Sequence, residues 1–283
     1  MPTAPAATRE LFAAMFDDAA IFPPGNAPLQ RAVADHWAHR ASAHAPLVGA
    51  FVCSDSRLPE LAAALRLADR PLPLTLVVTS GARSLPRVLD DVGAEPGIDL
   101  RSVEIAVTEP EHLLGSELRD IAQATPPGLT CYVELPIDPG LGEALEQVAQ
   151  VGVRAKFRTG GATSAAFPTE LELAAAISSA LAQRVAFKLT AGLHHAVRHR
   201  DPVTGFQHHG FLNVVAAVAA GLDNAPEADV AALLGERSAE PLVAVAVSAD
   251  ATAVRASFAS FGTCSVDDPV RDLTRLGLLA APS

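Results

Sequence analysis

The sequence predicts an α/β fold, a (β/α)8 barrel with an enlarged segment between its seventh and eighth strands. Short apolar runs typical of strands recur along the 283 residues, and helical patterns separate most of them. Each strand with its helix takes roughly 25–30 residues, which favours a parallel sheet. Eight such units make a barrel, whereas an open doubly wound sheet is the alternative. No glycine-rich dinucleotide fingerprint follows the first strand, which counts against that alternative.

The strand pattern appears in eight segments of the chain. We expect strands near Ala19–Phe22, Leu47–Cys53, Leu74–Thr79, Val103–Val107, Thr130–Leu135, Val153–Phe157, Val185–Thr190 and Phe258–Gly262. Between most of them apolar residues recur at helical spacing, as at Leu29, Val33 and Trp37. The order is therefore strand and helix in alternation.

The enlarged segment separates the seventh strand from the eighth. It carries two helical patterns, at His209–Gly221 and Pro226–Gly235, and the apolar run Leu242–Val247. That run could be an extra strand or could itself be the eighth, in place of Phe258–Gly262. No linker rich in Gly, Ser or Pro divides the chain, so we expect a single barrel domain over residues 1–283.

Composition limits the partners. The chain has 21 Lys and Arg against 32 Asp and Glu, a net charge of −11, which argues against a broad nucleic-acid surface. The longest run of small apolar residues, Val214–Ala220, is too short to span a membrane. Residues 1–15 lack the apolar core of a signal peptide, and three cysteines lie far apart. We therefore expect a cytoplasmic protein with a small-molecule partner; the composition leaves a homo-oligomer open.

Charged residues alternate with apolar ones in four neighbouring strands. Side chains of a strand point alternately to its two faces, so if the apolar face packs under the helices, the polar face points into the barrel. The residues assigned to the interior in this way are Glu104, Tyr132, Glu134, Arg154, Lys156, Arg158 and Lys188. Charges buried without partners are costly, so this cluster should be either mutually paired or functional.

Lysine is rare in this chain. There are 19 arginines and only two lysines, Lys156 and Lys188, and the pattern places both inside the barrel on adjacent strands. Unlike arginine, lysine can lose its proton when it is desolvated or lies beside another cation. One amine with a lowered pKa would then attack a carbonyl group. The alternatives are chance placement, or two structural ion pairs with Glu104 and Glu134.

Three segments resemble the deoxyribose-phosphate aldolase family, which has a (β/α)8 fold. The run Lys156-Phe-Arg-Thr-Gly-Gly-Ala-Thr163 is similar to its Schiff-base lysine strand, and Phe187-Lys-Leu-Thr-Ala-Gly192 to the next strand with its second lysine. The run Phe261-Gly-Thr-Cys-Ser265 resembles the last strand and its phosphate-binding loop. By the same resemblance Glu104 takes the place of the acidic residue of the family.

The sequence departs from that family at several positions. Phe157 and Arg158 stand where the family has small hydroxylated residues, and the loop after Lys188 continues into Leu193-His-His195. These departures leave the substrate, and any phosphate on it, undetermined. The run Phe16–Pro24 also resembles a bacterial family that implies no function.

Together, the residues and the resemblance imply a class I, imine-forming aldolase-like lyase that acts on a small anionic carbonyl compound without cofactor or metal. Lys156 would form the imine, Lys188 would lower its pKa, Glu104 or Glu134 would move the proton, and Tyr132 would assist. The candidate substrate-binding residues are Arg158, Thr159, Gly160, Gly161, Thr190, His194, His195, Arg198, Gly262 and Ser265.

Other chemistry stays open. Five of the nine histidines lie at positions 194–209, after the seventh strand, where barrel enzymes keep their active sites. They could hold a metal with the inward carboxylates in a hydrolase or lyase, or they could contact the substrate or cover the site. A non-catalytic barrel that binds a metabolite is the second alternative. Asp17 and Asp18 either reach the barrel interior or cap the following turn, while Ser265 is favoured as a helix cap.

Overall fold

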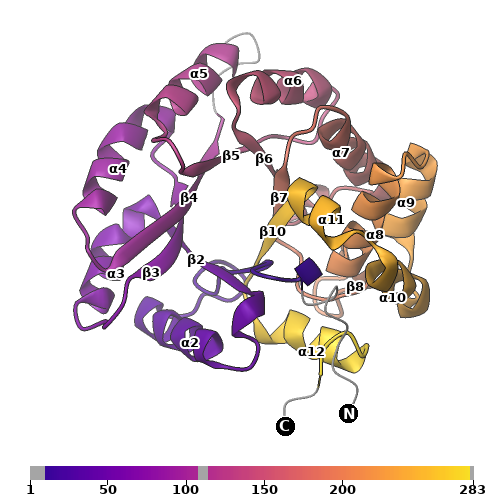
Figure 1. The fold of residues 1–283 in the computed structure, drawn as a ribbon, viewed down its shortest axis with the longest axis horizontal. Coiled ribbons are helices and arrows are strands. Elements are labelled where there is room, and N and C mark those ends of the chain that lie inside the picture. The colour runs from indigo at the N-terminus through magenta and orange to yellow at the C-terminus, as the bar shows by residue number, and fades with distance from the viewer. Residues whose placement is uncertain (1–9, 108–113, 281–283) are drawn as a thin grey trace.

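The protein is a closed barrel of eight parallel strands, as predicted. A computed structural model describes residues 10–107 and 114–280, with the strands in the order β1-β10-β7-β6-β5-β4-β3-β2 around the barrel (Figure 1). The strands are β1 (Phe16–Asp18), β2 (Val48–Ser54), β3 (Leu72–Val78), β4 (Ile98–Ala106), β5 (Thr130–Glu134), β6 (Arg154–Arg158), β7 (Phe187–Thr190) and β10 (Phe258–Thr263).

Helices surround the barrel (Figure 1). They are α2 (Leu29–Ala41), α3 (Leu58–Leu65), α4 (Leu85–Gly93), α5 (Leu114–Ala124), α6 (Leu141–Val151), α7 (Glu170–Ala182), α8 (Phe211–Leu222), α9 (Glu227–Gly235), α10 (Ala239–Ser248), α11 (Ala251–Ser257) and α12 (Asp267–Arg275). The start of α7 is fixed by a capping box, in which Thr169 accepts from the Glu172 backbone and the Glu172 carboxylate accepts from the Thr169 backbone.

The enlarged segment between the seventh and eighth barrel strands is present. It begins with a two-stranded antiparallel ribbon, β8 (His199–Arg200) and β9 (Gln207–His208), and continues through α8 to α11. The run Leu242–Val247 is helical and lies within α10, so β10 is the eighth barrel strand. Leu242 and Ala246, one helical turn apart, are the buried residues of α10, and this spacing explains why an apolar run became a helix.

The first strand lies earlier than predicted. It covers Phe16–Asp18, and the expected segment Ala19–Phe22 belongs to the following loop. The apolar run resembles a buried strand, and Ile21 is indeed buried, but within the loop. The strand itself carries two buried carboxylates, Asp17 and Asp18, and so lacks an apolar pattern. The Phe16 to Asp18 pairing with β10 closes the barrel.

The two faces of the central strands differ as the alternation predicted. Phe157, Phe187 and Leu189 are fully buried in the apolar core around the barrel, and the Phe187 ring stacks on Phe258 at 5.6 Å. On the opposite face Glu104, Lys156 and Lys188 are buried inside the barrel. Arg154 and Arg158, which were also predicted to lie there, are exposed because they stand at the two ends of β6. The core therefore lies between the sheet and the helices, and the barrel interior is free to hold charges.

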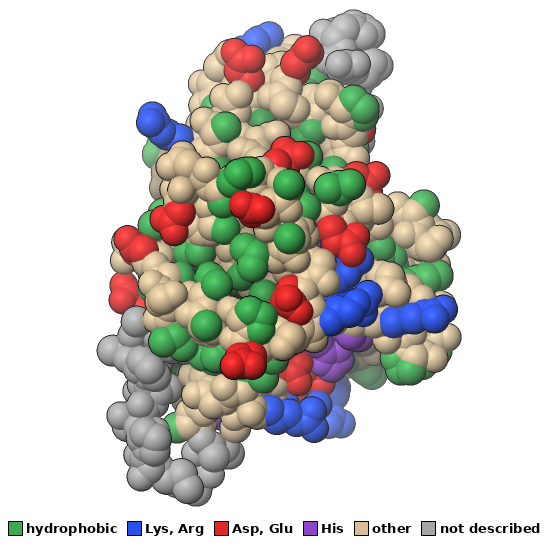
Figure 2. Space-filling view, turned by 90° about the vertical axis from the view of Figure 1, so that its right-hand side faces the viewer, with side chains coloured by type: hydrophobic (Ala, Val, Ile, Leu, Met, Phe, Trp, Pro, Cys, Tyr) green, Lys and Arg blue, Asp and Glu red, His purple; other side chains and the backbone are tan. Residues whose placement is uncertain are grey.

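The outer surface over α7 to α10 is neither uniformly apolar nor uniformly charged. Figure 2 shows apolar side chains scattered among acidic ones, with basic and histidine side chains gathered at one edge of this face. Among the described helices, none has both the length and the apolar content needed to cross a membrane.

Candidate active site

Five charged side chains of alternating sign cross the barrel interior. Lys188 Nζ lies 2.6 Å from Asp17 Oδ2 and 2.6 Å from Glu104 Oε1. The other oxygen of Glu104, Oε2, lies 2.6 Å from Lys156 Nζ, which is 2.9 Å from Glu134 Oε2. The two lysines thus share one carboxylate, and each also has a second carboxylate of its own.

Strand register produces this arrangement. Lys156 on β6 is paired with Lys188 on β7, and Glu134 on β5 is paired with Lys156. In parallel strands, residues in register point to the same face, so three charged side chains from three adjacent strands meet inside the barrel. Glu104 on β4 and Asp17 on β1 extend the series on either side.

The Asp17 end of the series is fixed by residues that the sequence did not single out. Ser260 Oγ donates to Asp17 Oδ2 at 2.7 Å, and the Ala50 backbone N–H donates to Oδ1 at 3.1 Å. A Cβ at Gly49 would lie 2.2 Å from Asp17 Oδ1, so only glycine leaves room for the carboxylate there. Asp17 therefore lies in the barrel interior, one of the two places considered for it.

The neighbouring Asp18 has a different partner. Its Oδ2 lies 3.0 Å from Nδ1 of His36, a fully buried residue of α2. Asp18 Oδ1 also accepts from the Ala20 backbone in the loop after β1. The two adjacent carboxylates thus serve separate sites, the barrel interior and the contact of β1 with α2.

The electrostatics of the lysine pair depend on the carboxylates around it. Burial alone would lower the pKa of Lys188, but the carboxylates of Asp17 and Glu104 outweigh it and raise that pKa above its usual range. Burial would also raise the pKa of Glu104, yet Lys156 and Lys188 outweigh it and lower that pKa to about 2. Because Glu104 lies between the two amines and Asp17 lies on the other side of Lys188, two carboxylates keep Lys188 as an ammonium ion.

A pocket of about 440 Å³ opens beside Glu134. It is lined by Glu134 and Arg158, by the apolar residues that follow β4 and β5, and by the loop that precedes α7. The Lys156 side chain is only 5% exposed, whereas that of Glu134 is 21% and that of Arg158 52% exposed. Glu134 therefore connects the buried amine of Lys156 with the pocket.

Tyr132 contacts the lysine pair through its ring. Lys188 Nζ lies 5.3 Å from the ring centroid, within the range of a cation–π contact. The Tyr132 hydroxyl accepts a hydrogen bond of 3.3 Å from Arg154, the first residue of β6. Since Lys156 and Arg158 follow Arg154 along β6, the hydroxyl points away from the end of the barrel where the pocket lies.

Several residues predicted to bind substrate join two loops to each other. Thr159 is buried, and its hydroxyl donates to the Ala191 carbonyl at 2.6 Å, while its backbone N–H donates to Thr190. A Cβ at Gly160 would lie 3.0 Å from the same Ala191 oxygen, so the loops after β6 and β7 pack backbone to backbone. Gly161 alone of these is exposed.

A second group of predicted substrate-binding residues lies around the end of β10. Gly262 is buried beside Thr190, whose Oγ1 would lie 3.4 Å from a Cβ added there. His194 Nδ1 lies 3.3 Å from Thr263 Oγ1. The prediction that Ser265 caps the following helix is wrong, because α12 begins after Val266 and has no side-chain capping bond.

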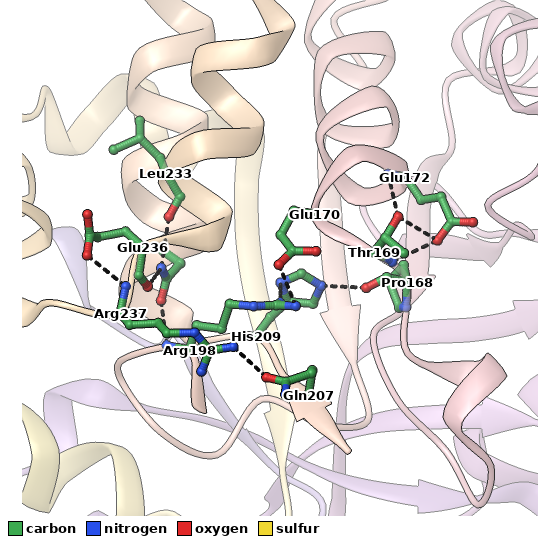
Figure 3. A network of polar contacts seen from close by, with 11 residues as sticks. Pro168, Thr169, Glu170, Glu172, Arg198, Gln207, His209, Leu233, Glu236 and Arg237 are labelled. Carbon is green, nitrogen blue, oxygen red and sulfur yellow. Dashed lines mark hydrogen bonds and ion pairs between the residues drawn. The ribbon is translucent and has the colours of Figure 1, made fainter. Parts of the chain in front are cut away.

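His195 and Arg198 lie in networks of their own. His195 Nδ1 is 3.1 Å from Asp272 Oδ2 on α12. Arg198 is buried, with NH2 2.7 Å from Glu170 Oε1 and NH1 3.0 Å from His209 Nδ1 (Figure 3). Within the described residues, no hydrogen bond or ion pair of His195 or Arg198 reaches the lysine pair. His195 and Arg198 therefore belong to contacts outside the lysine pair.

The segment at 194–209 was also considered as a metal site. In the part of the chain that the structure describes, no three His, Cys, Asp or Glu side chains are grouped so that they could hold a metal ion. His199 and His208 instead face each other across the β8–β9 ribbon, with ring centroids 5.3 Å apart.

No protein-family model matches the chain, and no curated protein matches it. A search of solved structures finds similarity to a putative fructose-1,6-biphosphate aldolase from Coccidioides immitis. The two share 15% sequence identity with a TM-score of 0.41, over 87% of this chain and 90% of that one.

Proposed function

We propose that the protein is a class I aldolase-like lyase in which Lys156 forms an imine with a small anionic carbonyl substrate. The observation that carries this proposal is the position of Lys156, whose amine is bound by two carboxylates, one of which, Glu134, also lines the pocket. An amine that attacks a carbonyl must first lose a proton, and a carboxylate at 2.9 Å with access to the pocket can accept and return it.

The reaction needs one proton carrier. Lys156 passes a proton to Glu134, and the free amine attacks the carbonyl carbon. The carbinolamine loses its oxygen as water, with the proton that Glu134 returns, and leaves a protonated imine. Glu134 then takes the proton of the substrate β-hydroxyl while the adjacent C–C bond breaks, and the electron pair of that bond enters the imine as an enamine. Protonation of the enamine carbon by Glu134 and hydrolysis release the product and Lys156.

The remaining charges position Lys156. Glu104 stays ionised because both lysines lower its pKa, so it keeps a fixed negative charge beside the imine nitrogen. Lys188 has a raised pKa and stays an ammonium ion, which holds Glu104 in place while Asp17 holds Lys188. In this proposal Lys188 orients the carboxylate and does not form the imine.

Borohydride trapping tests the proposal. The protein is incubated with pyruvate, acetaldehyde, hydroxyacetone or dihydroxyacetone phosphate, reduced, digested and mapped by mass spectrometry. We expect a reduced adduct on the peptide that carries Lys156, its loss in Lys156→Arg, and retention of the Lys156 site in Lys188→Arg. Turnover of a carbonyl substrate without any adduct would rule out the imine, and binding without turnover that survives both variants would favour a metabolite-binding barrel.

A further inference from the structure

We infer that the substrate is a short 2-oxo acid whose carboxylate binds Arg158 while its keto carbon meets Lys156. This inference rests on the proposed function, because it assigns the substrate of the same amine. It comes from the contacts of Glu134 and Arg158, and from the charges that line the pocket.

One carboxylate already spans the two cations that would hold such a substrate. Glu134 Oε2 lies 2.9 Å from Lys156 Nζ, and its Oε1 lies 3.9 Å from Arg158 NH1. The amine and the guanidinium are therefore separated by little more than one carboxylate group. In a 2-oxo acid the keto carbon is bonded directly to the carboxylate carbon. The keto carbon can therefore meet the Lys156 amine while the carboxylate meets the Arg158 guanidinium. A ketone whose anionic group lies several bonds from the carbonyl does not fit this short span.

Arg158 is available for a ligand. It ends β6 two residues after Lys156, on the same face of the strand, and lines the pocket. Its contact with Glu134 is too long for a hydrogen bond, and among the described residues no hydrogen bond of its guanidinium is found. A planar guanidinium with free N–H groups binds a carboxylate through two parallel hydrogen bonds.

The charge of the pocket fits a monoanion. Glu172 uses its carboxylate to cap α7, accepting from the Thr169 backbone at 2.7 Å and its hydroxyl at 2.9 Å. Glu134 is matched by Lys156, so among the described lining residues Arg158 carries the charge that lacks a close partner. A phosphate dianion would bring a second negative charge beside two carboxylates, whereas one carboxylate matches one guanidinium.

Apart from Glu134, Arg158 and Glu172, the described residues that line the pocket are apolar. They include Val107, Pro136, Ile137, Ala165, Ala166 and Pro168. These residues offer no hydrogen-bonding side chain to the hydroxyl groups of a sugar, and a hydroxyl buried without a partner is costly. The carbon chain beyond the keto group is therefore expected to be short, with no hydroxyl group beyond the one that Glu134 deprotonates. When Lys156 forms an imine with the 2-oxo acid, its nitrogen replaces the keto oxygen, which leaves as water.

The experiment measures the concentration of each carbonyl compound that gives half-maximal borohydride labelling of Lys156. The probes are pyruvate, hydroxyacetone as a ketone without charge, and dihydroxyacetone phosphate. In Arg158→Gln we expect the half-maximal concentration of pyruvate to rise about tenfold or more, the effect of losing a charge-assisted bidentate pair. The value for hydroxyacetone should stay within about twofold, because that ketone has no group for Arg158 to bind. Arg87→Gln on α4, an exposed position, is the matched control and should change neither value.

The outcomes separate the two proposals. Equal weakening of pyruvate and hydroxyacetone in Arg158→Gln overturns the 2-oxo acid assignment while the imine mechanism stands. Labelling of the wild type by dihydroxyacetone phosphate at lower concentration than by pyruvate overturns it as well. If no carbonyl compound labels Lys156 although the protein turns one over, the imine mechanism itself fails. Circular dichroism of Arg158→Gln checks that the fold is retained, which is expected because this side chain is half exposed.

Discussion

Asp17 and Lys188 form a buried ion pair of 2.6 Å that links the first and seventh barrel strands across β10. Ser260 of β10 donates to the same Asp17 oxygen, so three strands meet at one atom. Asp17 thus stands at one end of the series of charges. It holds Lys188, which holds Glu104, and Glu104 in turn holds Lys156. The pair is remote in sequence, and it ties the closure of the barrel to the geometry of the candidate active site.

Removing the Asp17 charge should destabilise the fold. In Asp17→Asn the buried ammonium of Lys188 keeps only Glu104 as a charged partner, and breaking a buried pair costs about 3 kcal/mol. Denaturant unfolding monitored by circular dichroism measures the change in the free energy of unfolding. Asp35→Asn removes an exposed ion pair with Arg31 and should change stability by less than about 1 kcal/mol. Equal effects of the two variants would mean that Asp17 does not stabilise the barrel.

A methyl group at position 49 should have a related effect. In Gly49→Ala the new Cβ would meet the Asp17 carboxylate, which must shift from Lys188 and Ser260. Overpacking at a buried position costs about 1–3 kcal/mol, so we expect a lower midpoint of denaturant unfolding. Gly142→Ala in α6 is the matched control, because its Cβ meets nothing within 4 Å and alanine favours a helix. A Gly49→Ala protein as stable as the control would contradict this packing argument.

The sequence predicts the inward placement of the lysine pair because that inference needs only local information. Alternation assigns Lys156 and Lys188 to one face of their strands, and the parallel register brings them together. The direction of the Lys188 pKa shift is not local, since it depends on Asp17, which is far away in sequence and reaches Lys188 only when the barrel closes. A three-residue strand with two acidic residues also gave too weak a pattern to be recognised beside the apolar run after it.

Several of the predicted binding residues contact other parts of the protein, and their composition does not distinguish this role from ligand binding. Loop residues such as Thr159 and Gly160 have the composition expected of an anion-binding loop, but the same composition suits two loops that pack closely. Arg198 likewise has the chemistry of an anion ligand, yet Glu170 and His209 already occupy its guanidinium. Only the fold determines whether a polar group meets a ligand or another part of the protein.

Glu134 should control the rate of imine formation. In Glu134→Gln the amine of Lys156 loses the carboxylate that accepts its proton, and general acid–base catalysis is worth about a hundredfold or more. We therefore expect borohydride labelling of Lys156 to slow by about that factor. Glu143→Gln, at an exposed position in α6, should leave the labelling rate unchanged. A rate in Glu134→Gln equal to that of the wild type would assign the proton transfer to another group.

His209 should make stability depend on pH. Burial lowers the pKa of His209 from its ordinary 6.5 to about 4, and the Arg198 guanidinium acts in the same direction. The neutral ring accepts from Arg198 at Nδ1 and donates from Nε2 to the Pro168 carbonyl at 2.8 Å, an arrangement that a second ring proton would break (Figure 3). Because the unfolded chain binds this proton more readily, the stabilisation is complete above pH 6.5 and falls by about 3 kcal/mol as the pH decreases to 4.

Unfolding free energies measured between pH 8 and pH 4 test this dependence. In His209→Gln the loss of stability on acidification should be smaller than in the wild type, with a residual dependence from His194, whose pKa burial also lowers to about 4. His44→Gln, at the start of a short turn outside the core, should keep the wild-type profile. If the unfolding free energy depends on pH with the same slope in the wild type and in His209→Gln, the ring is not held neutral.

Protonation of His209 should also affect labelling, because its partner Pro168 lines the pocket. Below pH 5 the concentration of pyruvate needed to label Lys156 should rise, and His209→Gln should reduce that rise.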